Sequence, residues 1–426
     1  MHAEALNIDI QETIDTPPMK VTSGIHTLCY LMIAFGVIVF AWSLIAGNSP
    51  EVVWGSYYVN FLFFMGISVG AVITTVIVQI VRATWSVPVR RIGEAHIAFL
   101  PIAFLLFLGS YLGKDYLFPW ATAPMPGRET WMEPNFVYLR FAVLFLLFFY
   151  FLYRYTRLSL RSDIGTVREK AKDKELWKGG IYYKLSQGWQ GDEEIPLLQR
   201  RMSILAPVVI ACYAVIWTLF STEMIVGMDT IWFSNMFGGF QFLGNVYMGW
   251  AALALFSFYY ASKNPTFAKM QRRRVRWDLG MLCFGFCMLW GYTFFSQFLP
   301  QWYSNMPEET QWLYLRTREL PWKSLGYVAF CCSFVIPFIT LLSEDVKKNP
   351  WTLSVVACII FVGVWFEKYV VVMPQISPNA IPFGLVDIGI FLAMFGMYLL
   401  SILWFMACFP MITVSHPQAQ NETSSW

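Results

Sequence analysis

The sequence predicts an all-α polytopic membrane protein with ten transmembrane helices, in which spans 2–5 and spans 6–9 each form a four-helix bundle and spans 1 and 10 flank them. Of the 426 residues, 57% are hydrophobic and 13% are charged, and the mean hydropathy is +0.52. A soluble domain carries about 25% charged residues. Ten apolar segments each approach or exceed the ~20 residues that a helix needs to cross a bilayer. Lys and Arg are concentrated in the connections on one side of these segments.

The ten apolar segments define the elements of the predicted fold. Their approximate ranges are 25–46, 57–81, 94–113, 136–156, 203–226, 240–261, 277–299, 323–343, 351–373 and 384–410. None alternates with the two-residue period of a barrel strand, and only helices and closed barrels satisfy their backbone in lipid. A ten-helix membrane domain therefore covers residues 25–410, between tails at 1–24 and 411–426.

The basic residues predict the orientation of the chain. Of the 30 Lys and Arg residues, 23 lie at Lys20, in the 82–91 and 263–276 linkers, in the 154–201 connection and at Lys347–Lys348. Cytoplasmic loops carry the excess of Lys and Arg, so both termini are expected in the cytoplasm. The first 24 residues are polar and acidic and lack the apolar core of a signal peptide. The 157–202 segment, whose charges alternate in sign, is expected to be a cytoplasmic loop that is solvated or contacts a partner.

The sequence lacks the motifs that several classes of function require. The eight cysteines lie in apolar segments without the C-x-x-C-H motif of covalent haem or the spacing of an iron–sulfur site. Cys283 and Cys287, one helical turn apart, are expected to be core residues rather than metal ligands. The chain has no phosphate-binding G-x-x-x-x-G-K-[ST] loop, and its net charge of +3 does not indicate nucleic acid. Any redox metals are therefore expected in partner subunits.

Weak internal similarity predicts a parallel repeat of residues 54–226 and 232–373. The matching positions are Trp54 with Trp232, Arg91 with Arg274, Glu94 with Asp278, Arg140 with Arg316, and Glu223 with Glu367. The first four pairs are 176 to 184 residues apart. Because each copy holds an even number of spans, both copies keep the same orientation in the membrane.

Ionisable residues inside spans are costly and are therefore functional candidates. On the cytoplasmic side these are Glu94, His96 and Asp278. A third span that begins near residue 87 places Glu94 roughly 10 Å from the helix start, one turn after Arg90 and Arg91. The alternative role for Glu94 is thus an interfacial ion pair, and Asp278 has the same alternative with an arginine four residues before it. His96 lies on a different helix face from Glu94.

A second set of candidates lies toward the outer ends of the spans, namely Glu223, Glu367, Asp387 and Arg140. The two glutamates are expected near helix C-termini, where the helix dipole disfavours a negative charge. Their alternative role is in structural ion pairs with Arg140 or Lys368. Polar residues between the two levels could join them into a proton route; these are Asn60, Ser68, Thr74, Thr75, Gln241, Asn245 and Gln297.

Four stretches carry a family resemblance. They are "NFLFFMGISVGAV" (60–72), "WSVPVRRIGEAHIAFLPIAFLLFL" (85–108), "YLFPW" (116–120) and "FVYLR" (136–140). The chain resembles the NrfD-like integral membrane subunits, and among them the ActF type of bacterial alternative complex III, a quinol:cytochrome c or high-potential acceptor oxidoreductase. The resemblance covers all ten spans and is more specific in the 60–140 block than in the second half.

The resemblance implies a bacterial inner-membrane location and a subunit without a redox centre, which is not an enzyme alone. Implied partners are a multihaem cytochrome c subunit, a periplasmic iron–sulfur subunit, a second NrfD-like subunit of the ActC type, small membrane and haem subunits, and lipids. Haem c and iron–sulfur clusters then belong to those partners, and quinone or quinol is the ligand that this chain could bind. The ActC type carries a histidine where this chain has Val69, which favours a companion role over the main quinol-oxidising site.

Two other functions remain open from the sequence. A secondary transporter also shows repeats and intramembrane carboxylates, and it should have paired broken helices at mid-membrane. A purely structural scaffold is the second alternative, in which the carboxylates serve assembly alone.

Overall fold

The computed structural model describes residues 10–229 and 231–415, and within them the chain is helical without any strand. The predicted all-α fold with ten membrane-spanning helices is confirmed. The single-element spans are α2 (Ser23–Ile45), α3 (Pro50–Ile80), α8 (Pro134–Lys170), α11 (Phe237–Lys263), α13 (Arg273–Ser304), α18 (Pro350–Ile376) and α19 (Leu385–Cys408).

Three spans are built from several helical pieces in continuous succession. Span 3 consists of α4 (Val87–Ala95), η2 (His96–Phe99), α5 (Leu100–Ser110), η3 (Tyr111–Gly113) and α6 (Lys114–Leu117). Span 5 consists of α10 (Glu194–Phe220), the π-helical turn η5 (Ser221–Ile225) and η6 (Val226–Met228). Span 8 consists of α15 (Trp322–Phe330), the π-helical turn η7 (Cys331–Val335) and α16 (Ile336–Leu342).

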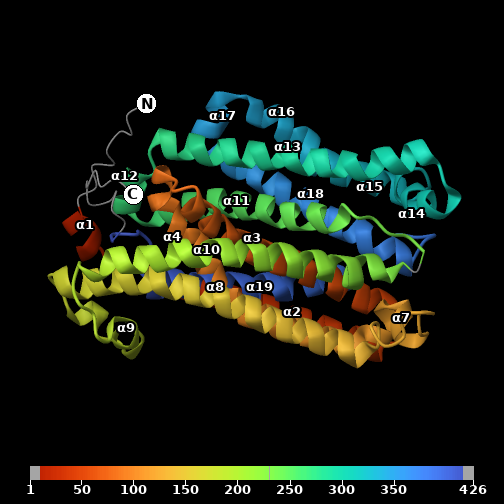
Figure 1. Cartoon of the computed structure of the whole chain (residues 1–426), viewed down its shortest axis with the longest axis horizontal. Coiled ribbons are helices and arrows are strands. Elements are labelled where there is room, and N and C mark those ends of the chain that lie inside the picture. The colour runs from red at the N-terminus through yellow and green to blue at the C-terminus, as the bar shows by residue number, and fades with distance from the viewer. Residues whose placement is uncertain (1–9, 230, 416–426) are drawn as a thin grey trace.

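The spans run side by side along the long axis of the molecule (Figure 1). Helix α3 packs against α4, α5 and α10, and α8 packs against α10, which gives one bundle. Helices α11, α13, α15, α16 and α18 pack together as the second bundle, and α2 and α19 pair beside α3. The predicted grouping of the spans is therefore the observed one. Helix α3 lies at the centre because it also packs along α11 and α18 of the second bundle.

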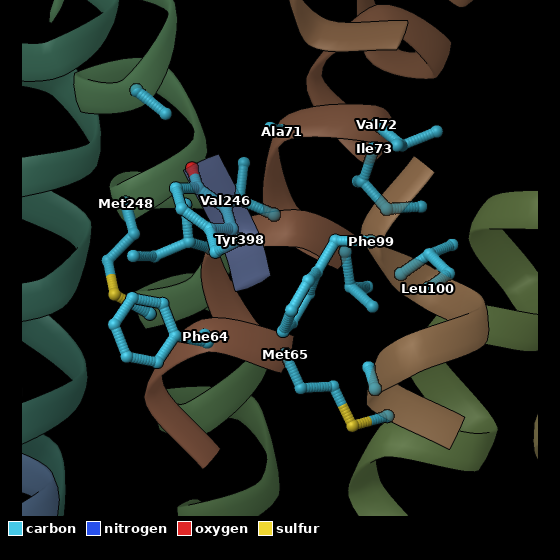
Figure 2. Packing of buried hydrophobic residues seen from close by; sticks show 14 of the residues in the cluster. Phe64, Met65, Ala71, Val72, Ile73, Phe99, Leu100, Val246, Met248 and Tyr398 are labelled. Carbon is cyan, nitrogen blue, oxygen red and sulfur yellow. The ribbon is translucent and has the colours of Figure 1, made fainter. Parts of the chain in front are cut away.

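Two glycines set the closest approach between the bundles, where α3 crosses α11. A Cβ atom added to Gly70 would lie 1.8 Å from the Asn245 carbonyl oxygen, and one added to Gly249 would lie 2.5 Å from the Gly70 carbonyl carbon. Only glycine allows backbones to approach this closely. Figure 2 shows the apolar packing nearby, with Phe64 of α3, Met248 of α11 and Tyr398 of α19 around one region of the core. The middle of the molecule is thus tightly packed.

Short helices mark the two ends of the bundle (Figure 1). The α1 end carries α1 (Ile10–Asp15), η1 (Thr84–Ser86), η4 (Glu175–Trp177), α9 (Gly180–Ser186), α12 (Pro265–Met270) and α17 (Glu344–Lys348). The α14 end carries α7 (Pro119–Thr122) and α14 (Pro307–Thr317). At the α1 end, Asp15 accepts the Lys172 backbone N–H at 3.0 Å, and this bond lowers the pKa of the Asp15 carboxyl.

The predicted loop and tails need correction at the α1 end. Helix α8 continues to Lys170 and α10 already begins at Glu194, so the connection is 171–193 rather than 157–202. Residues 411–415 of the predicted tail are buried, and Thr413 Oγ1 donates to the Val87 carbonyl at 3.1 Å. In the predicted N-terminal tail, residues 10–15 form α1 and α2 already begins at Ser23. Residues 1–9 and 416–426 of the predicted tails lie outside the described residues. The predicted loop was too long because amphipathic helix ends that pack on protein can carry as many charges as a loop.

Candidate functional site

A buried ionic network occupies the α1 end. Arg91 forms ion pairs with Glu94 of its own helix and with Asp163 of α8. Arg90 Nε lies 3.3 Å from Glu94, and all four side chains are at most 3% exposed. Two cations therefore balance two anions away from solvent. A buried charge needs such partners, because an uncompensated one costs several kcal/mol.

The network extends to a tyrosine and to the C-terminal residues. Arg90 donates to the Tyr155 hydroxyl at 2.8 Å, and Tyr155 donates to the Thr75 carbonyl at 2.9 Å. Asp163 accepts the Ser415 backbone N–H at 2.9 Å. For Glu94 the sequence left open a functional role or an interfacial ion pair; the pair with both arginines is present, but it is buried in protein. Asp163 was missed because it falls in the segment assigned to a loop.

The other two candidates at this end do not join the network. His96 Nδ1 lies 2.9 Å from the Ile92 carbonyl, and its ring packs edge-on against Phe256 with ring centres 5.3 Å apart. As the helix geometry predicted, His96 faces away from Glu94. Asp278 is partly exposed, and no cation in the described chain lies within 4.0 Å of its carboxylate. Arg274, four residues earlier, is exposed and still acts on Asp278 through its charge, but no ion pair between the two is formed.

At the α14 end, the first bundle holds the predicted pair of Arg140 and Glu223. The two side chains form an ion pair, and the Trp131 indole N–H donates to Glu223 Oε1 at 2.7 Å. The Arg140 guanidinium also lies 4.1 Å from the centre of the Trp131 ring. Glu223 sits in the π-helical turn η5, a distortion that often occurs at functional sites.

The second bundle pairs Glu367 with Lys368, as the sequence allowed. Lys368 Nζ lies 2.9 Å from Glu367 Oε1, and Gln241 contacts both side chains. The Trp290 indole N–H donates to Glu367 Oε2 at 3.0 Å. Contrary to the prediction, Glu367 lies in the interior of α18 rather than at its C-terminal end. This carboxylate is therefore held by a cation and by two neutral donors.

Asp387 caps its own helix. Its Oδ2 accepts the Gly384 backbone N–H at 2.9 Å in the first turn of α19. The four outer candidates thus form three separate groups, namely Arg140 with Glu223, Glu367 with Lys368, and Asp387 by itself. The sequence could not resolve this grouping, because it depends on which helices pack together.

A cavity of about 400 Å³ adjoins Glu367 at the α14 end of the second bundle. Its aromatic walls and polar groups define what we call the aromatic cavity, and they include Trp232, Phe240, Trp290, Phe294, Trp312, Phe330, Glu367 and Arg316. The Trp232 and Trp312 rings stack with centres 3.9 Å apart. The Trp232 indole N–H is buried and has no partner among the described residues. Pockets of this kind, mainly apolar with few polar groups, typically bind small molecules.

Arg316 in the wall of this cavity has no carboxylate partner within 4.0 Å in the described chain. Its guanidinium donates to the carbonyls of Val370 at 2.9 Å, Val371 at 3.0 Å and Trp312 at 2.8 Å. Pro374 lacks the N–H that would otherwise bond the Val370 carbonyl four residues earlier, so that carbonyl is available. Burial lowers the pKa of Arg316 to about 9, so it remains protonated at neutral pH. The sequence had matched Arg316 to Arg140 by position, but their partners differ.

The polar residues between the two ends do not form a continuous chain of hydrogen bonds. Asn60 accepts the Trp365 indole N–H at 2.9 Å near the α14 end, and Thr75 belongs to the network at the α1 end. These two residues are roughly 22 Å apart along α3. Between them, the Ser68 hydroxyl and the Asn245 amide N–H are buried and have no partner in the part of the chain that is described. The structure therefore shows one buried network at the α1 end and separate ion-paired groups at the α14 end, with the glycine crossing between them.

The fold and these sites define a polytopic α-helical membrane protein with buried ion pairs at both ends and an aromatic cavity at one of them. No group of three or more His, Cys, Asp or Glu residues suited to a metal ion occurs within residues 10–229 and 231–415. No protein-family model matches the sequence, and no curated protein matches it significantly.

Proposed function

We propose that this chain is a membrane subunit of a respiratory or photosynthetic quinol:electron-acceptor oxidoreductase of the alternative complex III type. The observation that carries the proposal is the position of Glu367, a buried ion-paired carboxylate that lines an aromatic cavity within a membrane helix bundle. The chain contributes quinone-site architecture, an assembly surface and carboxylates that exchange protons. Partner subunits, a multihaem cytochrome c and an iron–sulfur protein among them, carry the electrons.

The cavity residues fit a quinol ring. Aromatic walls stack on a planar ring, Glu367 accepts a hydrogen bond from a hydroxyl, and the unpaired Trp232 N–H donates to an oxygen. Phe295 and Tyr327 line the cavity and are 55% and 56% exposed on the lipid-facing surface, so a ligand dissolved in the bilayer can approach between α13 and α15. A bound quinol would supply two electrons and two protons. Glu367 would then orient the ring and take up a proton at its carboxylate.

The buried carboxylates at the two ends give this subunit its proposed role in proton movement. Glu94 and Asp163 would exchange protons with the α1 end, and Glu223 and Glu367 with the α14 end. Ser68 and Asn245 are the polar groups between them. The Lys and Arg excess supports a cytoplasmic α1 end, and the membrane that we propose is a bacterial inner membrane.

The test combines purification from native membranes with matched variants. A tagged chain should co-purify with haem c and iron–sulfur signals, visible by absorption and electron paramagnetic resonance. Glu367→Gln should lower quinol turnover by roughly tenfold or more, as expected for loss of a proton-transferring group, while the complex still assembles. Glu308→Gln, an exposed carboxylate in α14, should leave turnover unchanged.

The rival functions give different results in the same experiments. A scaffold predicts that Glu367→Gln reduces assembly and leaves turnover per assembled complex unchanged. A transporter predicts solute uptake by the chain alone in liposomes and no haem-containing partners. Each of the ten spans is continuously helical in the described residues, whereas transporters of the repeat type use helices broken at mid-membrane. This observation disfavours the transporter.

A further inference from the structure

Residues 409–415 pack against the α1 end of the bundle instead of leaving it, and we call them the strap. Helix α19 ends at Cys408, and the strap continues from it without regular secondary structure. Every residue of the strap except Pro410 is buried. The strap is therefore held in place by apolar burial, which involves Phe409, Met411, Ile412 and Val414.

Side-chain hydrogen bonds join the strap region to three elements of the α1 end. Where the strap begins, Tyr182 of α9 donates to the last carbonyl of α19 at 2.5 Å. Thr413 Oγ1 donates at 3.1 Å to the carbonyl of Val87, the first residue of α4. At the other end of the strap, the Ser415 backbone N–H donates to Asp163 Oδ1 of α8 at 2.9 Å. The strap therefore runs from α19 past the start of α4 to α8.

The contact with Asp163 joins the strap directly to the buried ionic network. Asp163 Oδ2 pairs with Arg91, whereas Oδ1 accepts from the backbone N–H and from the hydroxyl of Ser415. The Ser415 hydroxyl also contacts the Ser162 hydroxyl. Ser415 thus satisfies the carboxylate oxygen that Arg91 leaves free, and Asp163 is 0% exposed. Closure of the strap and the negative charge of Asp163 therefore stabilise each other.

The backbone of the strap is not bonded to its neighbours. Among the described residues, no backbone–backbone hydrogen bond joins 410–415 to another element, and the Val414 N–H bonds within the strap, to the Ile412 carbonyl at 3.1 Å. The spans, by contrast, are held by continuous ladders of backbone hydrogen bonds. Proteins open locally in cooperative units. A segment that shares no backbone bonds with its neighbours can open as such a unit while the helices stay intact.

We propose that the strap is a gate for solvent at the α1 end. It opens as a unit while the ten spans stay folded, and its position controls whether water reaches the buried ionic network. In the closed position Ser415 covers Asp163, and the network is dry. In the open position Asp163 Oδ1 loses both of its Ser415 donors and faces water, so the carboxylate exchanges protons with the solvent. This gate goes beyond the proposed function and does not depend on it.

Hydrogen–deuterium exchange of the full chain in lipid nanodiscs measures the opening in wild type. Peptides that cover the strap should exchange roughly tenfold faster or more than those of the central helix α11, after correction for intrinsic rates. The first N–H groups of a helix have no partner within it. The amides of 87–90 at the start of α4, which are buried, should therefore exchange together with the strap.

Two variants that open the strap test its control over the network. Ser415→Pro removes both donors to Asp163, and Ile412→Glu places a charge where an apolar side chain is 4% exposed. A water-soluble carbodiimide with glycine ethyl ester labels carboxyl groups that reach water, and mass spectrometry locates the label. In both variants Asp163 should be labelled roughly tenfold faster or more than in wild type.

Controls separate opening of the strap from unfolding of the bundle. Glu223 and Glu367 lie at the α14 end and should keep their wild-type labelling rates. Ser401→Ala is the control variant, because Ser401 is a buried α19 residue whose hydroxyl donates within its own helix, to the Met397 carbonyl at 2.8 Å. It should leave the labelling of Asp163 unchanged.

Two results would overturn the gate. If the wild-type strap exchanges no faster than α11, the strap is a fixed part of the core. If strap exchange rises in the variants but Asp163 is labelled at the wild-type rate, the strap does not control access to the network. Where a variant also exposes Glu223 and Glu367, the bundle has unfolded, and the exchange of the wild-type strap and of 87–90 decides.

Discussion

Replacing Asp163 by Asn tests the buried network at the α1 end most directly. The side chains of Arg90, Arg91, Glu94 and Asp163 carry two positive and two negative charges and are at most 3% exposed. Asp163→Asn keeps the shape but leaves one positive charge uncompensated. Removing one partner of a buried ion pair costs about 3–5 kcal/mol. Because Asn can still accept from Ser415, we expect the lower end, about 3 kcal/mol.

The assay is reversible unfolding of the purified chain in mixed micelles, with the free energy extrapolated to zero denaturant. Asp173→Asn is the matched control, since Asp173 is exposed in the 171–193 connection, and it should stay within about 0.5 kcal/mol of wild type. Adding Arg91→Gln to Asp163→Asn restores neutrality and should recover about 1–2 kcal/mol. A loss below 1 kcal/mol for Asp163→Asn, or a double variant less stable than the single one, would refute the charge-balance argument.

Three further predictions concern other parts of the fold. Gly70→Ala should destabilise the chain by about 1–3 kcal/mol, because the added Cβ forces α3 away from α11. Gly285→Ala is the control and should leave the stability unchanged, because nothing lies within 4 Å of an added Cβ. The free energies of unfolding of the two variants are compared with that of wild type. Trp131→Phe should cost about 1.5–3 kcal/mol because Glu223 loses a charged hydrogen bond, and equal stability would contradict that role. The pKa of Asp15 is lowered in the folded state. The contribution of Asp15 to holding α1 is therefore complete above the ordinary Asp pKa of 3.8 and is lost as the pH falls through the folded pKa. Hydrogen exchange of the α1 amides, corrected for intrinsic rates, should rise only at such acidic pH.

The helices themselves were largely readable from the sequence. Apolar length fixes a span, so all ten appeared near their predicted positions. The ends were less predictable where a helix leaves the apolar region but still packs on protein. Helix α8 is the clearest example, because its last 14 residues carry several charges and yet hold the buried Asp163.

For the candidate residues, contacts along one helix were predictable from the sequence, whereas contacts between helices were not. Local pairs along one helix, such as Arg90 with Glu94 and Glu367 with Lys368, follow from spacing. Asp278 shows the limit of this reasoning, since the exposed arginine four residues before it forms no ion pair with it. Trp232 and Arg316, which line the aromatic cavity, matched other residues by repeat position, but no sequence signal placed them around Glu367.

The sequence by itself determined that the chain is a ten-span helical membrane protein with more basic residues on one side, because hydropathy and charge act on each segment separately. Only the tertiary structure decided which charges meet. Asp163 reaches Arg91 across 72 positions, and Glu223 reaches Arg140 across 83. Such sites depend on helix packing, and here the contact of Gly70 with the α11 backbone fixes how closely the two bundles pack together.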